Sequence, residues 1–113
     1  MNKIEKPWGY EIHWAVTPQY VGKILFVKAG EALSLQYHEQ KEETMYFESG
    51  ECRVESGPSI EELTEKIYRS GEVFHIPPRH LHRISAITDC RIFEVSTNFL
   101  NDVVRLKDQY GRK

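Results

Sequence analysis

Two stretches of this chain have side chains that could bind a metal ion. In the first, Gly30–Gly50, Gln36 and His38 stand two residues apart, and Glu43 follows five residues after His38. The second stretch, far along the chain, ends at His82 and adds another imidazole. Two imidazole nitrogens, one carboxylate and one amide oxygen are donors suited to a first-row divalent metal ion. These residue types therefore predict a metal site made by Gln36, His38, Glu43 and His82.

The alternation of side chains indicates how strands would position these ligands. From residue 33 to residue 38, polar and apolar residues alternate, so Gln36 and His38 would share one face of a strand. Glu43 opens the next strand after a short polar turn, so its carboxylate could approach from the neighbouring strand. His82 would come from a third strand. The opposite, apolar face of the first strand needs a cover, from the N-terminal segment or a second subunit, and we expect a homodimer.

Short strand-like runs separated by glycine and proline fill most of the chain. They predict strands at residues 10–16, 20–28, 33–38, 43–48, 52–55, 64–69, 73–76, 82–87 and 90–97. Ser59 and Glu62 have the spacing of a capping box, so one helical turn is expected at residues 60–63, and another near 102–106. No long segment has a helical period. We therefore predict an all-β, antiparallel sandwich or barrel with at most short helical turns, in a single domain of residues 1–113.

Composition narrows the classes of function. A chain of 113 residues, 40% hydrophobic and 28% charged, can bury one core. The net charge of −2 gives no reason to expect nucleic acid or an anionic membrane as partner. Neither a signal-peptide pattern nor a run of ~20 apolar residues is present, so we expect a cytoplasmic protein. Cys52 and Cys90 form no close-spaced pair and are expected to be reduced and buried.

The spacing of the candidate ligands resembles the two motifs of the cupin superfamily. Cupins have G-x5-H-x-H-x4-E-x6-G and, later, G-x5-P-x-G-x2-H. The first spacing is kept here at Gly30, Gln36, His38, Glu43 and Gly50, and the second at Gly71, Pro77 and His82. Two residues depart from the pattern, because Gln36 replaces the first histidine and Arg79 the glycine. The resemblance implies a cupin fold, that is, an antiparallel double-stranded β-helix or jelly-roll barrel.

More narrowly, the whole chain is similar to the cupin domain of type II mannose-6-phosphate isomerases, which are often fused to mannose-1-phosphate guanylyltransferases. The shared blocks are the PWG segment near Trp8, the LSLQ-x-H strand, the IP and HR pairs, and a closing D-x-VR-x-x-D-x-YGR pattern from Asp102. The resemblance implies that Gln36, His38, Glu43 and His82 bind one divalent ion (zinc, manganese, iron, nickel or cobalt). Where the family has HHHRAEHW, this chain has HEQKEETM, with Lys41 in place of arginine. The sequence lacks the guanylyltransferase domain, so nucleotidyl transfer is not expected of it.

The resemblance implies a metal-dependent sugar-phosphate isomerase of the mannose-6-phosphate type. Such an enzyme moves a proton between C1 and C2 through an enediolate, while a divalent ion polarises the carbonyl. A base with a pKa near the working pH must accept the proton. The sequence does not identify this base, and the catalytic candidates are Lys41, Glu39, Glu42 and His80. Candidates to bind the phosphate of a small sugar phosphate are Arg79, Arg83 and Lys41, because such cations pair with phosphate oxygens.

Two other functions fit the same residues. One is a non-catalytic sugar or sugar-phosphate binding cupin, which the change from HHHR to HEQK favours. The other is a metal-dependent oxygenase, since two histidines and one carboxylate suit non-haem iron. Gln36 as a fourth ligand would fill one open position and fits an oxygenase less well. Turnover of mannose-6-phosphate, saturable binding without turnover, and oxygen uptake distinguish the three functions.

Overall fold

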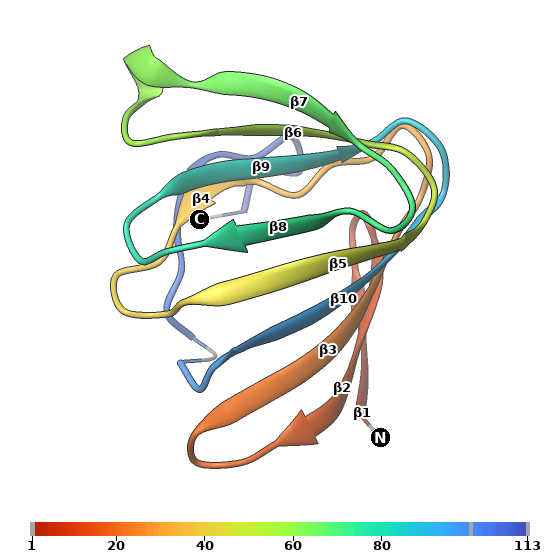
Figure 1. Cartoon of the computed structure of the whole chain (residues 1–113), viewed down its shortest axis with the longest axis vertical. Coiled ribbons are helices and arrows are strands. Elements are labelled where there is room, and N and C mark those ends of the chain that lie inside the picture. Colours follow the sequence, from red (N-terminus) through yellow and green to blue (C-terminus); the bar gives the residue numbers. More distant parts are fainter. Residues whose placement is uncertain (1, 100, 113) are drawn as a thin grey trace.

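The computed structural model describes residues 2–99 and 101–112, which form eleven strands and one short 3₁₀ turn. The elements are β1 (Asn2–Lys6), β2 (Gly9–Val16), β3 (Tyr20–Val27), β4 (Leu35–Tyr37), β5 (Glu43–Ser49), β6 (Cys52–Gly57), η1 (Ile60–Glu62), β7 (Thr64–Tyr68), β8 (Val73–Ile76), β9 (Leu81–Ala86), β10 (Cys90–Thr97) and β11 (Val104–Lys107). The strands make two sheets that face each other (Figure 1). All strand pairs among the described residues are antiparallel, so the all-β antiparallel fold predicted from the sequence is confirmed.

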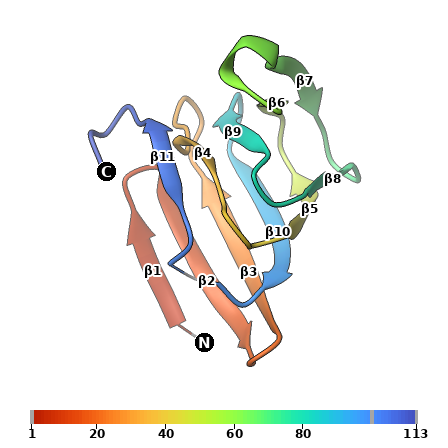
Figure 2. The ribbon, with the colours of Figure 1, turned by 90° about the vertical axis from the view of Figure 1, so that its left-hand side faces the viewer.

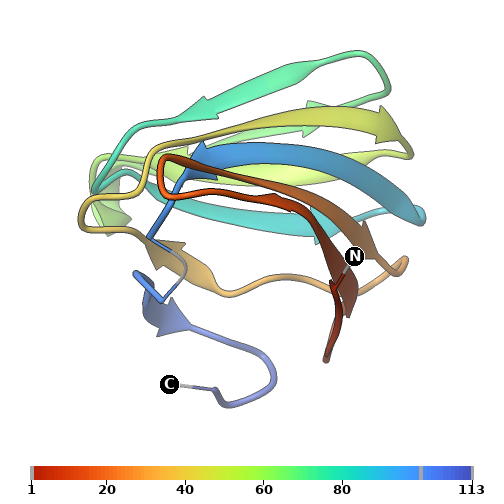
Figure 3. The same cartoon turned by 90° about the horizontal axis from the view of Figure 1, so that it is seen from below.

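The chain passes from one sheet to the other at most of its turns. One sheet has six strands in the order β1-β2-β3-β10-β5-β8, and the other has five in the order β11-β4-β9-β6-β7. Only β1–β2, β2–β3 and β6–β7 are pairs of consecutive strands within one sheet. Figure 3 shows the two layers from below, with β4 and β11 in the lower one. This alternation is the arrangement of a jelly roll, in which pairing strands are distant in sequence.

The space between the sheets has an apolar part and a polar part. Inward-facing residues alternate with exposed ones along each long strand, as in β10, where Ile92 is buried and Phe93 is exposed. The apolar part is a cluster that includes Phe47, Ile84 and Ile92. The same strands also place charged residues inward, including Glu43 on β5 and Glu94 on β10. Because burying charge is costly unless it is paired or bound, the polar part is the place to look for a site.

Several predicted elements differ from the observed ones at the two ends of the chain. The N-terminal residues form strand β1, which the sequence did not predict. The helical turn predicted near 102–106 is wrong, because Val104–Lys107 is strand β11 and pairs with β4 (Figure 2). This pairing lies beside Leu35, which is 1% exposed in the single chain, so a second subunit is not needed to cover that residue. The predicted turn after Ser59 is confirmed as η1. The Ser59 hydroxyl donates to the Glu62 carboxylate, and its side chain does not cap a backbone N–H group of the turn.

The two cysteines meet in the fold although they are distant in sequence. Cys52 opens β6 and Cys90 opens β10, on opposite sheets, and their Sγ atoms lie 2.6 Å apart. Both are free cysteines and buried, as predicted. The contact with the Cys90 sulfur, together with burial, raises the pKa of the Cys52 thiol. Cys52 and Cys90 are therefore small buried side chains, as predicted, and they contact each other.

Candidate metal centre

The predicted ligands reach one place from both sheets. His38 directly follows β4, His82 is the second residue of β9, and Glu43 is the first residue of β5. Because β4 and β9 lie in one sheet and β5 in the other, Glu43 faces the histidines across the sandwich. The expectation that Glu43 approaches from a strand next to that of His38 is therefore wrong. Gln36 is directly opposite His82 in the β4–β9 pair, so the two side chains point to the same face.

The three ionisable groups are close together and deeply buried. Nε2 of His38 lies 3.1 Å from Oε2 of Glu43, and Nε2 of His82 lies 3.9 Å from Oε1 of Glu43. One candidate ligand atom from each residue lies within 4.8 Å of the other two. The exposed fractions are 4% for His38, 2% for Glu43 and 1% for His82. This is the convergence that the spacing of the sequence predicts.

Backbone carbonyls orient both imidazole rings. Nδ1 of His38 lies 2.5 Å from the carbonyl oxygen of Asp102, and Nδ1 of His82 lies 3.0 Å from that of His80. A carbonyl oxygen only accepts hydrogen bonds, so each ring must donate from Nδ1. Each neutral imidazole then presents the lone pair of Nε2 toward Glu43. Metal-binding histidines are commonly oriented by such hydrogen bonds to the other ring nitrogen.

The donor atoms left without partners fit a metal ion. Nε2 of His38, Nε2 of His82 and Oε2 of Glu43 are buried and make no hydrogen bond to any described residue, although Oε2 has an ion pair with Lys41. Buried polar atoms are normally satisfied, so three unsatisfied ones at one point need an explanation. A divalent ion accepting two imidazole nitrogens and one carboxylate oxygen provides it. The residues present therefore fit a bound metal.

Lys41 adds a buried cation beside the cluster. Its Nζ lies 3.2 Å from Oε2 of Glu43 and 3.4 Å from Oε2 of Glu94. Burial disfavours its charged form, but Glu94 and Glu43 outweigh this effect and raise the pKa of Lys41. Burial also opposes ionisation of Glu43, but the Lys41 ammonium beside its Oε2 outweighs this effect and lowers the pKa of Glu43. Lys41 is thus a permanent cation and Glu43 a permanent carboxylate at neutral pH.

Asp102 ties the C-terminal segment to the loop between β4 and β5. Its carboxylate accepts hydrogen bonds from the backbone N–H groups of Glu39, Gln40 and Lys41, at 3.0, 2.7 and 3.0 Å. The carbonyl of the same residue accepts the hydrogen bond from His38. One residue thus positions both a candidate ligand and the buried cation. Its closing motif was recognised in the sequence, but this positioning role was not foreseen.

Gln36 lies near the cluster and has a side-chain partner of its own. Its Oε1 accepts a hydrogen bond of 2.7 Å from the hydroxyl of Ser34. Gln36 and His38 also line a cavity of about 110 Å³ together with Lys41 and Asp102. A role as fourth ligand stays a prediction, since the amide oxygen has a second lone pair that the Ser34 hydroxyl leaves open.

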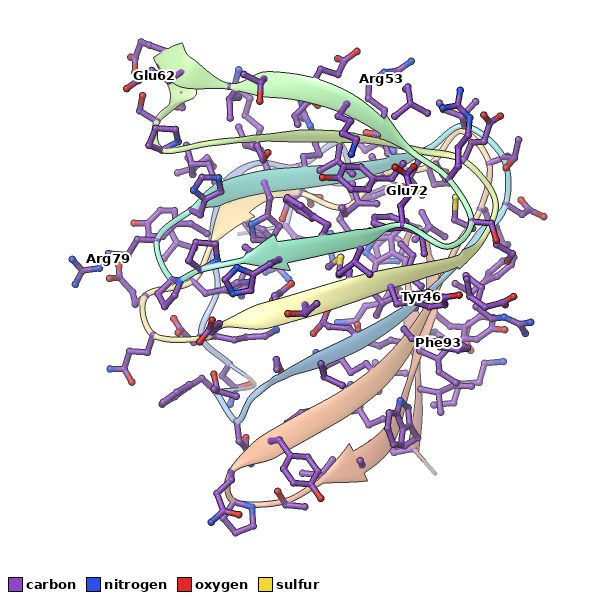
Figure 4. The ribbon with its side chains drawn as sticks, in the orientation of Figure 1. Tyr46, Arg53, Glu62, Glu72, Arg79 and Phe93 are labelled. Carbon is purple, nitrogen blue, oxygen red and sulfur yellow. The ribbon has the colours of Figure 1, made fainter. Side chains whose placement is uncertain are left out.

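The other predicted site residues are at the rim or on the outside. Arg79 projects from the β8–β9 turn into solvent (Figure 4), with a side chain 77% exposed. Arg83 points away from His82 along β9 and makes two hydrogen bonds to Glu55. Glu39 and Glu42 are exposed, and Glu42 pairs with His75 at a distance of 2.6 Å. His80 is half-buried and contributes its carbonyl to His82. Among the predicted catalytic and phosphate-binding residues, Lys41 is the one whose side chain has a described contact with the cluster.

The backbone conformation of Arg79 shows why the cupin pattern has glycine at this position. It has a φ of 64° and is the only described residue other than glycine with positive φ. That backbone conformation favours glycine, which is the residue the pattern has at this position. The backbone N–H of Arg79 donates to the carbonyl of His38, so this turn is held against the end of the ligand strand.

Sequence reasoning missed three buried charged residues next to the site. Glu11 on β2, Lys23 on β3 and Glu94 on β10 are 8%, 7% and 3% exposed. Their signal was present, because each has the same strand phase as buried apolar residues such as Leu25 and Ile92. The alternation alone was not decisive, because the other face of these strands also has large apolar residues. The sequence therefore did not indicate which face of each strand is buried.

Several solved structures have a fold similar to that of this chain. Oxalate decarboxylase from Lactobacillus farciminis, solved as a formate complex, aligns with a TM-score of 0.78 at 21% identity, over 93% of this chain and 33% of that one. KdgF from Halomonas sp. aligns with a TM-score of 0.73 at 17% identity, over 86% and 87% of the two chains. Bacillus subtilis oxalate decarboxylase, in a study of its Mn(II) centres, aligns with a TM-score of 0.78 at 20% identity, over 94% and 30%. These likenesses show the fold of the chain, and it is the cupin fold that the sequence motifs imply.

Sequence comparison narrows the class to one family. A model of the family described as mannose-6-phosphate isomerase C-terminal matches residues 1–108, and the chain belongs to that family. The xanthan biosynthesis protein XanB of Xanthomonas campestris pv. campestris, in strains B100 and ATCC 33913, is 31% identical over 116 residues, covering 98% of this chain and 24% of XanB. The chain thus spans about a quarter of the length of these curated relatives. The resemblance stated from the sequence motifs is confirmed.

No helix among the described residues is long and apolar enough to cross a membrane.

Proposed function

We propose that this protein is a metal-dependent sugar-phosphate isomerase that interconverts mannose-6-phosphate and fructose-6-phosphate. The observation that supports this most is the convergence of His38, Glu43 and His82, with two buried Nε2 atoms that make no hydrogen bond to any described residue. Membership of the mannose-6-phosphate isomerase C-terminal family supports the choice of reaction. A bound divalent ion would supply a Lewis acid for the sugar carbonyl.

The residues around the proposed ion would prepare and stabilise charge. The backbone carbonyls of Asp102 and His80 hold the two imidazoles in the tautomer that leaves Nε2 bare. Lys41, a fixed cation between Glu43 and Glu94, would stabilise the negative charge that develops on the enediolate oxygen. Because its pKa is raised, Lys41 would act by its charge and its N–H donors, not as the base. Gln36 is proposed as the fourth ligand.

The base and the outer contacts remain proposals at the rim. The loop of Glu39 and Glu42 and the turn of Arg79 and His80 lie at the same end, since the Arg79 N–H donates to the carbonyl of His38. Each could contact a sugar whose carbonyl lies near the cluster. Arg83, paired with Glu55, would have to leave that partner to contact a ligand there.

The direct test is formation of fructose-6-phosphate from mannose-6-phosphate by protein freed of metal and reloaded with manganese, cobalt, nickel, zinc or ferrous ion. We expect activity only with metal, and the Mn(II) centres of the Bacillus subtilis relative make manganese the first choice. Glu43→Gln and His82→Gln should lose both the metal and turnover. His75→Gln changes an exposed histidine outside the cluster and serves as the matched control. Metal-loaded protein that binds the sugar phosphate without converting it would point to the binding cupin instead, and oxygen uptake by the ferrous protein to an oxygenase.

A homodimer is also part of this proposal, on a surface different from the one first expected. The outer face of the six-stranded sheet exposes large apolar side chains, including Trp14, Tyr46, Phe93 and Val95. Tyr46 and Phe93 lie side by side on it (Figure 4), with ring centroids 6.2 Å apart. Exposed apolar patches of this kind commonly mark protein interfaces. A cytoplasmic location likewise stays a prediction from the sequence.

A further inference from the structure

The cavity next to the candidate metal centre is lined by an excess of cations. It has a volume of about 110 Å³ and lies between the inner faces of β1, β2 and β3 and the strands β4 and β11. The described residues that line it include two carboxylates, Glu11 and Asp102, and the following five cations: Lys6, Lys23, Lys41, Arg105 and Arg112. His38 lines the same cavity, so these charges and a candidate metal ligand share one space.

Both carboxylates of the cavity are already engaged. Asp102 accepts three backbone N–H groups of the β4–β5 loop. Oε1 of Glu11 lies 2.7 Å from Nε2 of His13. Burial opposes ionisation of Glu11, but Lys23 and His13 outweigh it and lower its pKa, so Glu11 is a carboxylate at neutral pH. Both acids therefore already have partners among the described residues.

Lys23 is a buried cation whose ammonium group has unused hydrogen-bonding capacity. It is 7% exposed, and its Nζ lies 3.6 Å from Oε1 of Glu11, which is beyond hydrogen-bond length. It donates no hydrogen bond to any described residue. An ammonium group has three donors, and burying them without acceptors is costly. By contrast, Lys41 has Glu43 and Glu94 within 3.4 Å, and Arg112 makes two hydrogen bonds to Asp108 through its guanidinium.

We propose that Lys23, with Lys6 and Arg105 on the flanking walls, binds the phosphate group of the substrate inside this cavity. The inference rests on the proposed isomerase function and assigns it an interior phosphate subsite. A phosphate monoester carries about −1.5 to −2 charge at pH 7 and three acceptor oxygens. It would supply acceptors for the ammonium group of Lys23 and a negative charge beside it. The sugar carbonyl of the same ligand would then lie toward His38.

The test is direct binding, which does not depend on turnover. Calorimetric titration of metal-loaded protein with mannose-6-phosphate, inorganic phosphate and mannose should give binding of the first two and much weaker binding of mannose. Lys23→Met should weaken binding of both phosphates by about tenfold or more, the range expected for a lost charged hydrogen bond. It should leave metal content unchanged. Lys23→Arg, which keeps the charge, should retain most of the affinity.

Two further variants guard against a folding defect. Lys66→Met removes an exposed lysine on β7 and is the matched control. The double variant Lys23→Met/Glu11→Gln removes the buried pair together, so that no unpaired carboxylate is left beside the cavity. The inference is overturned if folded Lys23→Met or the folded double variant binds phosphate as the wild type does, or if oxalate binds more tightly than phosphate and depends on Lys23. Weaker phosphate binding in a protein that shows no isomerase activity would support the subsite and refute the proposed reaction. Full turnover by Lys23→Met with unchanged phosphate binding would support the proposed reaction and refute the subsite.

Discussion

Removing the side chain of Asp102 should loosen the candidate metal centre without removing any ligand. Asp102→Ala abolishes three hydrogen bonds from the backbone of Glu39, Gln40 and Lys41, but keeps the carbonyl that accepts from His38. A hydrogen bond contributes about 0.5–1.5 kcal/mol net. The Glu39 and Gln40 residues are exposed, so water can replace part of what they lose. We therefore expect a loss of about 1.5–3 kcal/mol in the free energy of unfolding.

This loss corresponds to a fall of the melting temperature by roughly 6–12 °C, at about 4 °C per kcal/mol for a chain of this size. Asp102→Asn should cost about half as much, since one of its two side-chain oxygens remains as an acceptor. Because changes to groups that orient ligands commonly cost 10–100-fold in metal affinity, we expect about a tenfold weaker affinity for Asp102→Ala. Thermal denaturation of the metal-free protein and calorimetric metal titration measure the two effects separately.

The pH dependence adds an independent check on Asp102. Burial raises its pKa, but the backbone N–H groups of Gln40, Glu39 and Lys41 outweigh this and hold the pKa below its ordinary value of 3.8. Its contribution to stability is thus complete above about pH 4 and is lost as the pH falls through the lower, folded value. Asp89→Ala, which removes a single exposed hydrogen bond to the N–H of Ala29, is the control and should leave metal affinity unchanged. An Asp102→Ala protein with wild-type metal affinity and melting temperature would refute the positioning role.

Three further outcomes are expected. Burial lowers the pKa of His82 below 6.5, so the unfolded state binds protons more readily than the folded state does. The metal-free protein should therefore lose stability as the pH falls below about 6.5. Denaturant titrations at several pH values should show a flatter pH dependence for His82→Gln. Arg79→Gly should raise the unfolding free energy by about 1 kcal/mol by relieving the positive φ, and a fall in stability would show that the side chain matters more than the backbone. Sedimentation should find a dimer that Phe93→Glu dissociates while the exposed control Arg53→Glu does not; a monomeric wild-type protein would remove the homodimer proposal.

The local pattern of residues determined most of the strands and turns. Short β-branched and aromatic runs with glycine and proline between them define strands such as β3, β5 and β10 independently of their neighbours. The first and last strands were missed for a physical reason. β1 and β11 are short and largely polar, and they form because β2 and β4 offer them unpaired backbone groups.

The sequence by itself also determined which residues could bind a metal, because the donor types of Gln36, His38, Glu43 and His82 and their spacing are local properties. Only the tertiary structure decided that Glu43 faces the histidines from the opposite sheet, since sheet assignment depends on pairings between residues far apart in the chain. It likewise decided that Lys23 lies inside the polar cavity and Arg79 in solvent. The two cations differ because Lys23 lies on a strand face that the second sheet covers, whereas Arg79 lies in the turn between β8 and β9.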